Sequence, residues 1–342
     1  MHASEICHYT YICCAMFLLY QRSVHTWFFL CIFSSRKWWN EETVAVVTGG
    51  NKGIGFEVCK QFAIAGLRVV LTARDADRGQ EAHQKLKHEG FQNISFHQLD
   101  VTDAVSRTCF ASWLLREHGG FNILVNNAAI NGVAIDEVYL KENNINLKDF
   151  LWKQDHGSKG FILWYGSAKA CIETNYYGAK YITQALLPLV RHSDQGARII
   201  NVGSVMGQLT NLRNAKLQRE LARLECLSEA VIEGMSDKYL NDVKQHAWGD
   251  KSWPLKFSCY KMSKIALHAY TRLLATQLEK GFPDKMIFVN CVDPGPVRTD
   301  NTAGMGKFSP SEGAENIVWV ALLPCEECRS GKLFSGKKLA KY

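Results

Sequence analysis

The chain has 342 residues, of which 47% are hydrophobic and 21% charged, and its formal net charge is +7. This composition is that of a globular protein long enough for one large α/β domain, and it excludes a disordered or low-complexity chain. Positive residues such as Arg74, Arg78 and Lys85 are interleaved with acids, whereas a nucleic-acid-binding protein concentrates them in one stripe. We therefore expect no nucleic-acid partner, and we interpret the charge as a solvated surface with a site for an anionic cofactor.

Residues 1–37 differ in composition from the rest of the chain. Their two apolar runs, 9–20 and 26–33, are both shorter than the about 20 residues that span a bilayer. No basic start precedes the first run, and no small-residue cleavage site follows it. We expect a poorly ordered or loosely docked N-terminal extension, with a membrane or targeting role as the alternative, followed by a single cytoplasmic domain over residues 38–342.

An orderly alternation of elements begins near residue 42. The β-branched run 43–47 predicts a strand buried on both faces, the run from 56 to about 65 predicts a helix, and residues 67–72 predict a second strand. A glycine-rich turn at residues 48–55 connects the first strand to the helix. This order of elements is typical of a dinucleotide-binding unit, in which the helix N-terminus donates N–H groups to a pyrophosphate.

The glycines of this turn have separate functions. Gly49 permits the tight turn, Gly53 lets the backbone approach the pyrophosphate, and Gly55 lets the helix pack closely on the strand. Arg74 follows the second strand, at the position where an NAD-selective site needs an acid for the ribose diol. Arg74 and Lys52 instead offer cations to a 2′-phosphate, which favours NADP(H); a solvated surface arginine is the alternative for Arg74.

Two further predicted strands, 96–99 and 123–125, end at Asp100 and at residues 126–129. Ligands of an open α/β sheet bind beyond the carboxyl ends of its strands, so both segments are expected at the cofactor site. Asp100 can accept a hydrogen bond from an adenine amine or serve as a helix N-cap or turn residue, and both interpretations stay open.

The catalytic candidates come from two distant segments. The strand 197–202 ends at Gly203 and Ser204, and a strongly helical run begins near Tyr260. Tyr260 and Lys264 are four residues apart and so share one helix face. A free tyrosine has a pKa near ~10, and we expect the Lys264 ammonium to lower it so that the phenol can exchange its proton. Ser204 can hydrogen-bond the substrate oxygen and fix its position.

Together, these motifs resemble the short-chain dehydrogenase/reductase family over about residue 38 to the C-terminus. Within that family the chain is similar to the carbonyl reductase branch and to its plant members, the menthone, neomenthol and salutaridine reductases. The motifs that carry the resemblance are Thr48–Gly55, Asn126–Ala128, Ser204, Tyr260 with Lys264, and Pro294–Thr299.

The resemblance implies an α/β fold with one doubly wound, Rossmann-type parallel sheet and NADPH-dependent reduction of a lipophilic ketone, or oxidation of a secondary alcohol. It implies that Tyr260 is the general acid/base, that Lys264 is its partner and that Ser204 orients the substrate. Asn175 would hold a water in the proton relay, unless it is an ordinary helix-surface residue. A catalytically silent NADP-binding protein that acts through a partner is the alternative function.

The resemblance also implies that Val297 and Thr299 contact the nicotinamide amide. No metal is expected, because Cys325 and Cys328 form a lone CxxC pair without further ligands. The residues expected to bind the cofactor are Gly49, Asn51, Lys52, Gly53, Ile54, Gly55, Arg74, Asp100, Val101, Asn127, Tyr260, Lys264, Pro294, Gly295, Val297 and Thr299.

Two long segments depart from the usual pattern of the family. The first, 130–170, has an aromatic and apolar cluster at 161–165 that either lines a lipophilic pocket or packs in the core. The second, about 208–257, separates Ser204 from Tyr260 and has apolar residues at helical spacing. In the carbonyl reductase branch such an insertion covers the face that other members use to form tetramers, so we expect a monomer, with a different dimer as the alternative.

Overall fold

The computed structural model describes residues 37–132, 134–152, 159–282 and 285–342. The chain divides into two units, Met1–Trp39 and Asn40–Tyr342, and the described helices and strands all lie in the second. Of the expected extension at 1–37, all but the last residue lies outside the described residues. No described helix has the length and apolar character that crossing a bilayer requires.

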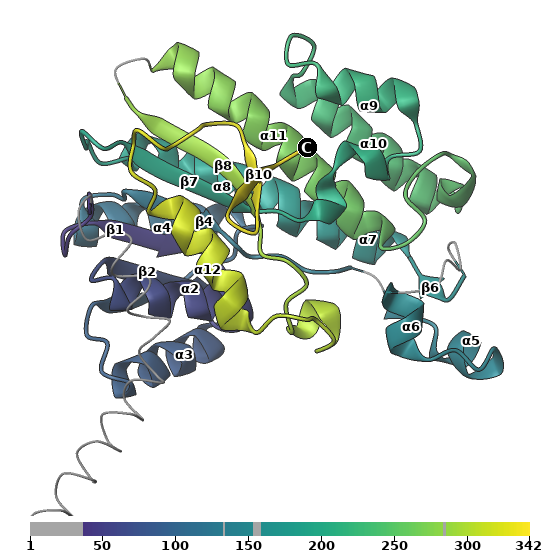
Figure 1. Ribbon diagram of the computed structural model, residues 1–342, viewed down its shortest axis with the longest axis horizontal. Helices are drawn as coiled ribbons and strands as arrows, with labels where there is room; N and C mark the ends of the chain where they lie inside the picture. Colours follow the sequence, from purple (N-terminus) through teal and green to yellow (C-terminus); the bar gives the residue numbers. More distant parts are fainter. Residues whose placement is uncertain (1–36, 133, 153–158, 283–284) are drawn as a thin grey trace, which may run out of the picture. The chain divides into compact units, whose positions relative to one another are not determined.

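An eight-stranded sheet forms the centre of the second unit (Figure 1), in the order β10-β9-β8-β7-β4-β1-β2-β3. Neighbouring strands from β3 to β9 are parallel, and only β10 runs antiparallel to its neighbour. β1, β4 and β7 are buried along their whole length, as strands covered on both faces must be. The strands are β1 (Val44–Val47), β2 (Arg68–Ala73), β3 (Ile94–Gln98), β4 (Ile123–Asn126), β7 (Ala197–Val202), β8 (Ile287–Asp293), β9 (Leu333–Ser335) and β10 (Lys338–Ala340).

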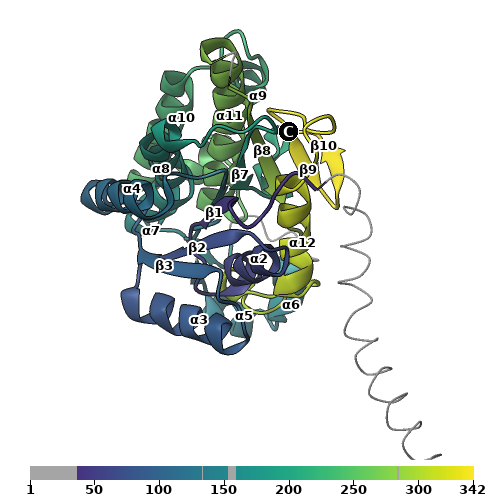
Figure 2. The same ribbon diagram turned by 90° about the vertical axis from the view of Figure 1, so that its left-hand side faces the viewer.

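Helices cover both faces of this sheet (Figure 2). α2 and α12 pack against each other on one face, while α4, α8 and α11 contribute to the large core on the other. α3 packs against β2 and β3. The doubly wound α/β fold is therefore confirmed, except that β9 and β10 form a hairpin where crossover connections were expected throughout. These helices are α2 (Gly53–Ile64), α3 (Ala76–His88), α4 (Ala104–His118), α7 (Tyr165–Ile172), α8 (Ala179–Leu186), α11 (Ser258–Gly281) and α12 (Pro310–Ala321).

The segment between β4 and α7 forms a small substructure with a core of its own. It contains β5 (Ala134–Ile135), α5 (Glu137–Glu142), α6 (Leu147–Trp152) and β6 (Phe161–Ile162). The ring of Phe161 lies 4.7 Å from that of Phe150 and 5.2 Å from that of Phe257, so Phe161 packs in this core. Trp164 is 60% exposed. The cluster at 161–165 therefore does not form a single pocket wall.

The predicted helical insertion before Tyr260 is confirmed, with helices α9 (Ala215–Ala222) and α10 (Glu229–Lys244). α10 packs against α7 and α11. Its acids Glu229 and Glu233 each lie 2.5 Å from the ammonium group of Lys180, whose side chain in α8 is almost fully buried. A buried ammonium group is costly unless it is paired, so these contacts attach the insertion to the body of the same chain.

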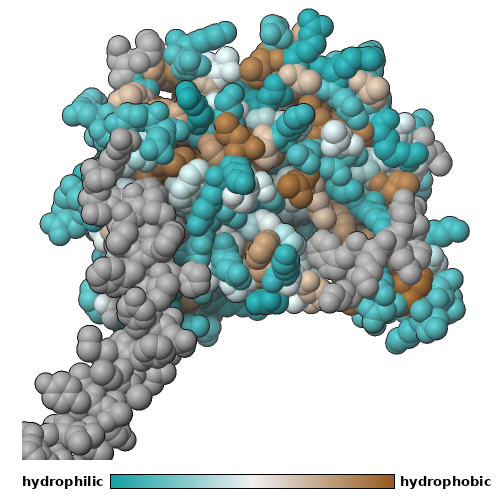
Figure 3. Space-filling view, in the orientation of Figure 1, coloured by the Kyte–Doolittle hydropathy of each residue, from teal (hydrophilic) through white to brown (hydrophobic). Residues whose placement is uncertain are grey.

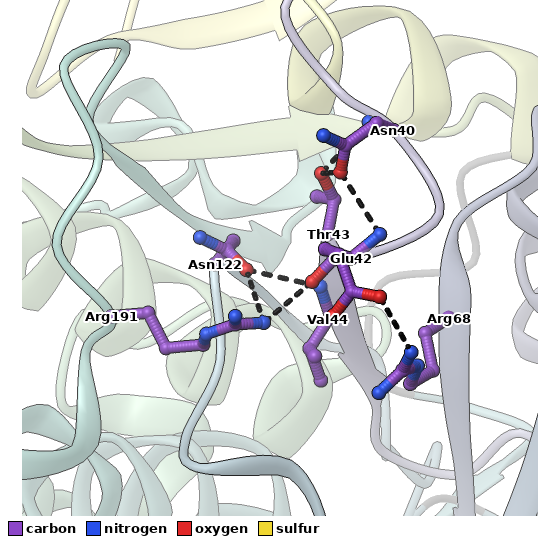
Figure 4. Close-up of polar contacts among 7 residues, drawn as sticks. All are labelled: Asn40, Glu42, Thr43, Val44, Arg68, Asn122 and Arg191. Carbon is purple, nitrogen blue, oxygen red and sulfur yellow. Dashed lines mark hydrogen bonds and ion pairs between the residues drawn. The ribbon is translucent and has the colours of Figure 1, made fainter.

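A polar cluster holds the amino-terminal edge of the sheet (Figure 4). Asn122 Oδ1 accepts the main-chain N–H of Val44 (3.0 Å), and Arg191 donates both to Asn122 and to the carbonyl of Glu42. The Glu42 carboxylate in turn pairs with Arg68 at the start of β2 (3.0 Å). These polar groups at the amino-terminal edge thus bond to one another. Two hollows of the molecule lie at the opposite, carboxyl edge.

Candidate active site

Two hollows lie at the carboxyl edge of the sheet. One is a groove of about 480 Å³ that includes the glycine turn, and the other is a cavity of about 450 Å³ that includes Ser204 and Tyr260. Asp300 and Asn301 line both. The strand order reverses between β1 and β4, which is the position at which open α/β sheets bind their ligands.

Most of the residues expected to bind the cofactor line the groove. Gly295 and Tyr260 line the cavity instead, and Gly55, Lys264 and Pro294 line neither hollow. The side chain of Val297 packs against α12, where a Cβ on Gly313 would lie 2.4 Å from it, so it does not point into the groove. The expected residues that do line the groove are Gly49, Asn51, Lys52, Gly53, Ile54, Arg74, Asp100, Val101, Asn127 and Thr299.

The glycine turn fits a dinucleotide phosphate. The first turn of α2 begins at Gly53, three residues earlier than predicted, and no side chain caps its amides, so these donors face the groove. Gly49 has a φ of +64°, which glycine adopts without strain. A Cβ on Gly55 would lie 2.4 Å from both the carbonyl oxygen of Gly49 and the side-chain amide of Asn127. The close packing predicted for Gly55 is therefore present.

The expected phosphate-binding cations have different surroundings. Lys52 forms an ion pair with Asp300, across the sequence from the glycine turn to the segment after β8. The hydrogen bond from Lys52 lowers the pKa of the Asp300 carboxyl. In the part of the chain that the structure describes, Arg74 forms no ion pair and lines the groove with Arg298. Among the described residues Arg298 forms no ion pair either, so the charges of Arg74 and Arg298 are both available there.

Asp100 takes the turn position that was one of its two interpretations. Its Oδ1 accepts the main-chain N–H of Thr102 (2.9 Å) and the Thr102 hydroxyl (2.7 Å). The N-cap of α4 is Asp103, which accepts from Ser106 N. Asp100 still lines the groove, so the turn role and an adenine contact are compatible.

Ser204 and Tyr260 line the cavity, and Lys264 lies beside Tyr260. Ser204 lies two residues beyond the end of β7, and its hydroxyl oxygen accepts from the N–H of Met206 (3.2 Å). Tyr260 lies in the first turn of α11, and the Lys264 nitrogen is 5.5 Å from the centre of its ring. Lys264 is buried and donates to the carbonyl of Val202 at the end of β7 (2.7 Å).

The electrostatics of this group differ from expectation. Burial raises the pKa of Tyr260, the Asp293 carboxylate raises it further, and a hydrogen bond with Ser204 lowers it. Burial also lowers the pKa of Lys264 to about 8. The expectation of a lowered pKa for Tyr260 is therefore wrong, because desolvation penalises the phenolate more than its neighbours stabilise it.

Asn175 is buried, so the helix-surface interpretation is wrong. It lies in a π-helical turn, Glu173–Gly178, between α7 and α8. Its Oδ1 accepts the N–H of Ile130 (2.8 Å), and its Nδ2 donates to the carbonyl of Ile130 and to the Ser263 hydroxyl (2.9 Å each). Asn175 thus fixes Ile130, which lines the groove; its part in a proton relay stays a prediction.

Two side chains at the site were missed in the sequence. Asp293, the last residue of β8, lines the cavity, and His268 lies one helical turn beyond Lys264. His268 accepts a hydrogen bond from the main-chain N–H of Ser204, and Asp293 accepts one from that of Val205. Their positions carried a signal: Asp293 directly precedes the Pro294–Gly295 motif, and His268 continues the helix face of Tyr260 and Lys264.

Comparisons with known proteins agree with this geometry. The sequence model of the short chain dehydrogenase family matches residues 43–151. (+)-Neomenthol dehydrogenase of Arabidopsis thaliana is 41% identical over 307 residues, covering 88% of this chain and 99% of that protein. Carbonyl reductase (NADPH) 1 of Mus musculus is 34% identical, covering 87% and 98%. The structure of salutaridine reductase from Papaver somniferum matches with a TM-score of 0.76 and 36% identity, over 85% of this chain and 99% of that one. This chain therefore belongs to the short-chain dehydrogenase/reductase family.

Proposed function

We propose that this protein is an NADP(H)-dependent carbonyl reductase that interconverts a lipophilic ketone and a secondary alcohol, of the terpenoid or alkaloid class. The observation that carries the proposal is the convergence of Ser204 and Tyr260 on the cavity, with the ammonium group of Lys264 beside the Tyr260 ring. The names of the related plant dehydrogenase and reductase support the reaction class and the kind of substrate.

The chemistry of the chain's own residues follows from their positions. Bound in the groove, NADPH supplies the hydride. The Ser204 hydroxyl hydrogen-bonds the carbonyl oxygen of the substrate, and the Tyr260 hydroxyl gives its proton to that oxygen. A raised pKa keeps Tyr260 protonated at neutral pH, which suits an acid in the direction of reduction. The Lys264 charge stabilises the phenolate that remains.

The groove supports NADP(H) over NAD(H). Arg74 occupies the end of β2, where a carboxylate would hold the ribose diol of NAD. Its guanidinium suits a phosphate, and no acid among the described residues pairs with it. The name of the mouse relative includes NADPH. Lys52 is a second cation, which would exchange its Asp300 partner for the cofactor.

The cavity supports a lipophilic substrate. Its volume of about 450 Å³ falls in the range of small-molecule sites, which are lined mostly by apolar groups with a few placed polar ones. Its polar lining consists of Ser204, Tyr260, Asn131, Glu137, Asp293, Asp300, Asn301 and Thr302. Its apolar wall consists of Ile135, Leu151, Val205, Met206, Phe257 and Pro296.

We also propose a monomeric, cytoplasmic enzyme. α10 packs against α7 and α11 of its own chain, on a surface that would otherwise be open to a second subunit. The face drawn in Figure 3 is mostly hydrophilic, with its hydrophobic residues in separate small patches. The cysteines of the described residues are free thiols, which supports a reducing compartment.

A substrate screen tests the proposed function. The purified chain is incubated with NADPH and a panel of ketones, including menthone, alkaloid ketones and quinones, and oxidation of NADPH is followed by its absorbance. We expect consumption with at least one cyclic ketone and none without substrate. Tight binding of NADPH with no turnover on any member of the panel would favour the silent NADP-binding protein instead.

A further inference from the structure

Two buried side chains hold the main chain at Ser204. The N–H of Ser204 donates to His268 Nε2 (3.4 Å), and the N–H of Val205 donates to Asp293 Oδ1 (3.3 Å). His268 is 2% exposed and Asp293 4%. These acceptors come from α11 and β8, so the segment after β7 is held from two different elements.

The His268 ring fills the space inside this segment. A Cβ on Gly203 would lie 2.6 Å from its Nε2, and a Cβ on Gly207 would lie 2.7 Å from its Cε1. The main chain therefore passes around the ring at van der Waals distance on both sides of Ser204. Burial, and then the charge of Lys264, lower the pKa of His268 to about 3. The ring is thus neutral at physiological pH, and its Nε2 can accept the Ser204 N–H.

Residues 333–342 support both acceptors from behind. The Ser335 hydroxyl donates to Asp293 Oδ2 (2.8 Å). The Tyr342 ring packs edge-on against the His268 ring, with 5.4 Å between centroids, and the Arg272 guanidinium lies 5.5 Å from the centre of the Tyr342 ring. Residues 333–342 thus contact both side chains that hold the Ser204 segment, Asp293 and His268.

We propose that His268 and Asp293 are positioning residues for Ser204, and that Ser335 and Tyr342 brace them. The proposal rests on the proposed function, in which Ser204 binds the substrate oxygen. A misplacement of about 1 Å at a reacting group can cost on the order of 100-fold in rate. The two acceptors do not touch the substrate oxygen in this role; they fix the serine that does.

Matched variants of α11 separate positioning from simple damage. His268→Leu removes the acceptor at similar volume, while His268→Gln keeps a side-chain oxygen near the position of Nε2 that can accept the Ser204 N–H. Thr271→Val is the structural control, because Thr271 Oγ1 accepts from Asn201 Nδ2 (2.8 Å) at the same interface between α11 and β7. It removes a buried hydrogen bond there and leaves the Ser204 segment untouched.

A second pair tests the brace. Ser335→Ala removes the donor to Asp293, and Ser330→Ala removes the Ser330 Oγ acceptor of the Val289 N–H (3.0 Å) at the other end of β8. Both changes delete one hydroxyl beside the same strand. Only the first acts on the acceptor that holds the serine segment. Tyr342→Ala removes the ring behind His268 and should behave as a milder His268→Leu.

The first measurement is hydrogen exchange by mass spectrometry on the peptide covering residues 203–208, without substrate. We expect exchange about tenfold faster in His268→Leu, and faster in Tyr342→Ala and Ser335→Ala, because the amides at 204 and 205 lose acceptors or support. His268→Gln, Thr271→Val and Ser330→Ala should match the wild type. This readout needs no turnover, so it decides the proposal even if the substrate screen fails.

The second measurement is kinetic, on a ketone from the screen with NADPH and with 4-deuterated NADPH. His268→Leu should lower kcat by about 10- to 100-fold, raise the isotope effect on kcat and leave the Kd for NADPH unchanged. His268→Gln should recover most of the rate. Wild-type exchange and wild-type kcat in His268→Leu would overturn the proposal, and so would equal losses in His268→Leu and Thr271→Val.

Discussion

The ammonium nitrogen of Lys264 lies 5.5 Å from the centre of the Tyr260 ring, one helical turn along α11. Lys264 also donates to the carbonyl of Val202 at the end of β7, so the helix that carries the phenol is tied to the strand that precedes Ser204. Proton transfer to the substrate therefore depends on a hydroxyl whose place is fixed from both elements.

Removing the Tyr260 hydroxyl should strongly lower turnover while leaving NADPH binding in the groove intact. Tyr260→Phe lacks the proton donor, and general acid–base groups contribute about 10²- to 10⁴-fold, so we expect kcat to fall within that range. The Kd for NADPH, measured by fluorescence titration, should stay near wild type because Tyr260 lines the cavity and not the groove. A variant that kept the wild-type rate would contradict the proposed mechanism.

The pH profile of reduction should respond to the charge of Asp293. Lys264 must be charged to stabilise the phenolate that Tyr260 leaves, so the rate falls as pH rises through the Lys264 pKa of about 8. Asp293 raises the pKa of both Tyr260 and Lys264, so Asp293→Asn should move the falling limb of kcat to lower pH. The asparagine keeps an oxygen for the Val205 N–H, and Ser335→Ala, which keeps the carboxylate, is the control. An unchanged falling limb in Asp293→Asn would show that the Asp293 charge does not shift the pKa that sets this limb.

Cofactor preference should depend on Arg74. Arg74→Ala removes the cation proposed to contact the 2′-phosphate, and we expect the Kd for NADPH to rise about tenfold, equivalent to ~1.4 kcal/mol, with that for NADH little changed. Arg68→Ala is the control, because Arg68 begins the same strand at the opposite edge of the sheet and pairs with Glu42. Equal effects on NADPH and NADH would show that Arg74 does not select the cofactor.

Close packing under the glycine turn should make one glycine intolerant of a methyl group. Gly55→Ala would place a Cβ 2.4 Å from the carbonyl oxygen of Gly49, so we expect weaker NADPH binding and destabilisation of about 1–3 kcal/mol. Gly234→Ala, in the middle of α10 with open space around it, should be neutral or slightly stabilising. Thermal unfolding and NADPH titration of the two variants provide the comparison, and equal melting temperatures would contradict the packing.

Sequence reasoning succeeded where function depends on local chemistry. The glycine turn, the Tyr260–Lys264 spacing and a serine at a strand end each lie within a few residues, and the period of the surrounding apolar residues places them on elements. Parallel strands then bring their carboxyl ends to one edge, which is why segments far apart in sequence could be assigned to one site.

What sequence reasoning missed depends on contacts between distant residues. The pairing of Lys52 with Asp300 and the bond from Ser204 to His268 join residues 248 and 64 positions apart, and no local pattern specifies them. The predicted direction of the Tyr260 pKa shift was wrong for a related reason. Spacing shows that Lys264 is near, but only the packed site shows how strongly burial acts on the phenol.

The small core of the segment between β4 and α7 is formed by Leu140, Phe150, Leu151 and Phe161, and it is separate from the core under the sheet. Ile135 and Leu151 of that segment also form the outer wall of the cavity. Substitutions in the segment between β4 and α7 can therefore change this part of the cavity lining without changing the groove that includes the glycine turn. We therefore expect substitutions in the segment between β4 and α7 to change the substrate specificity for ketones.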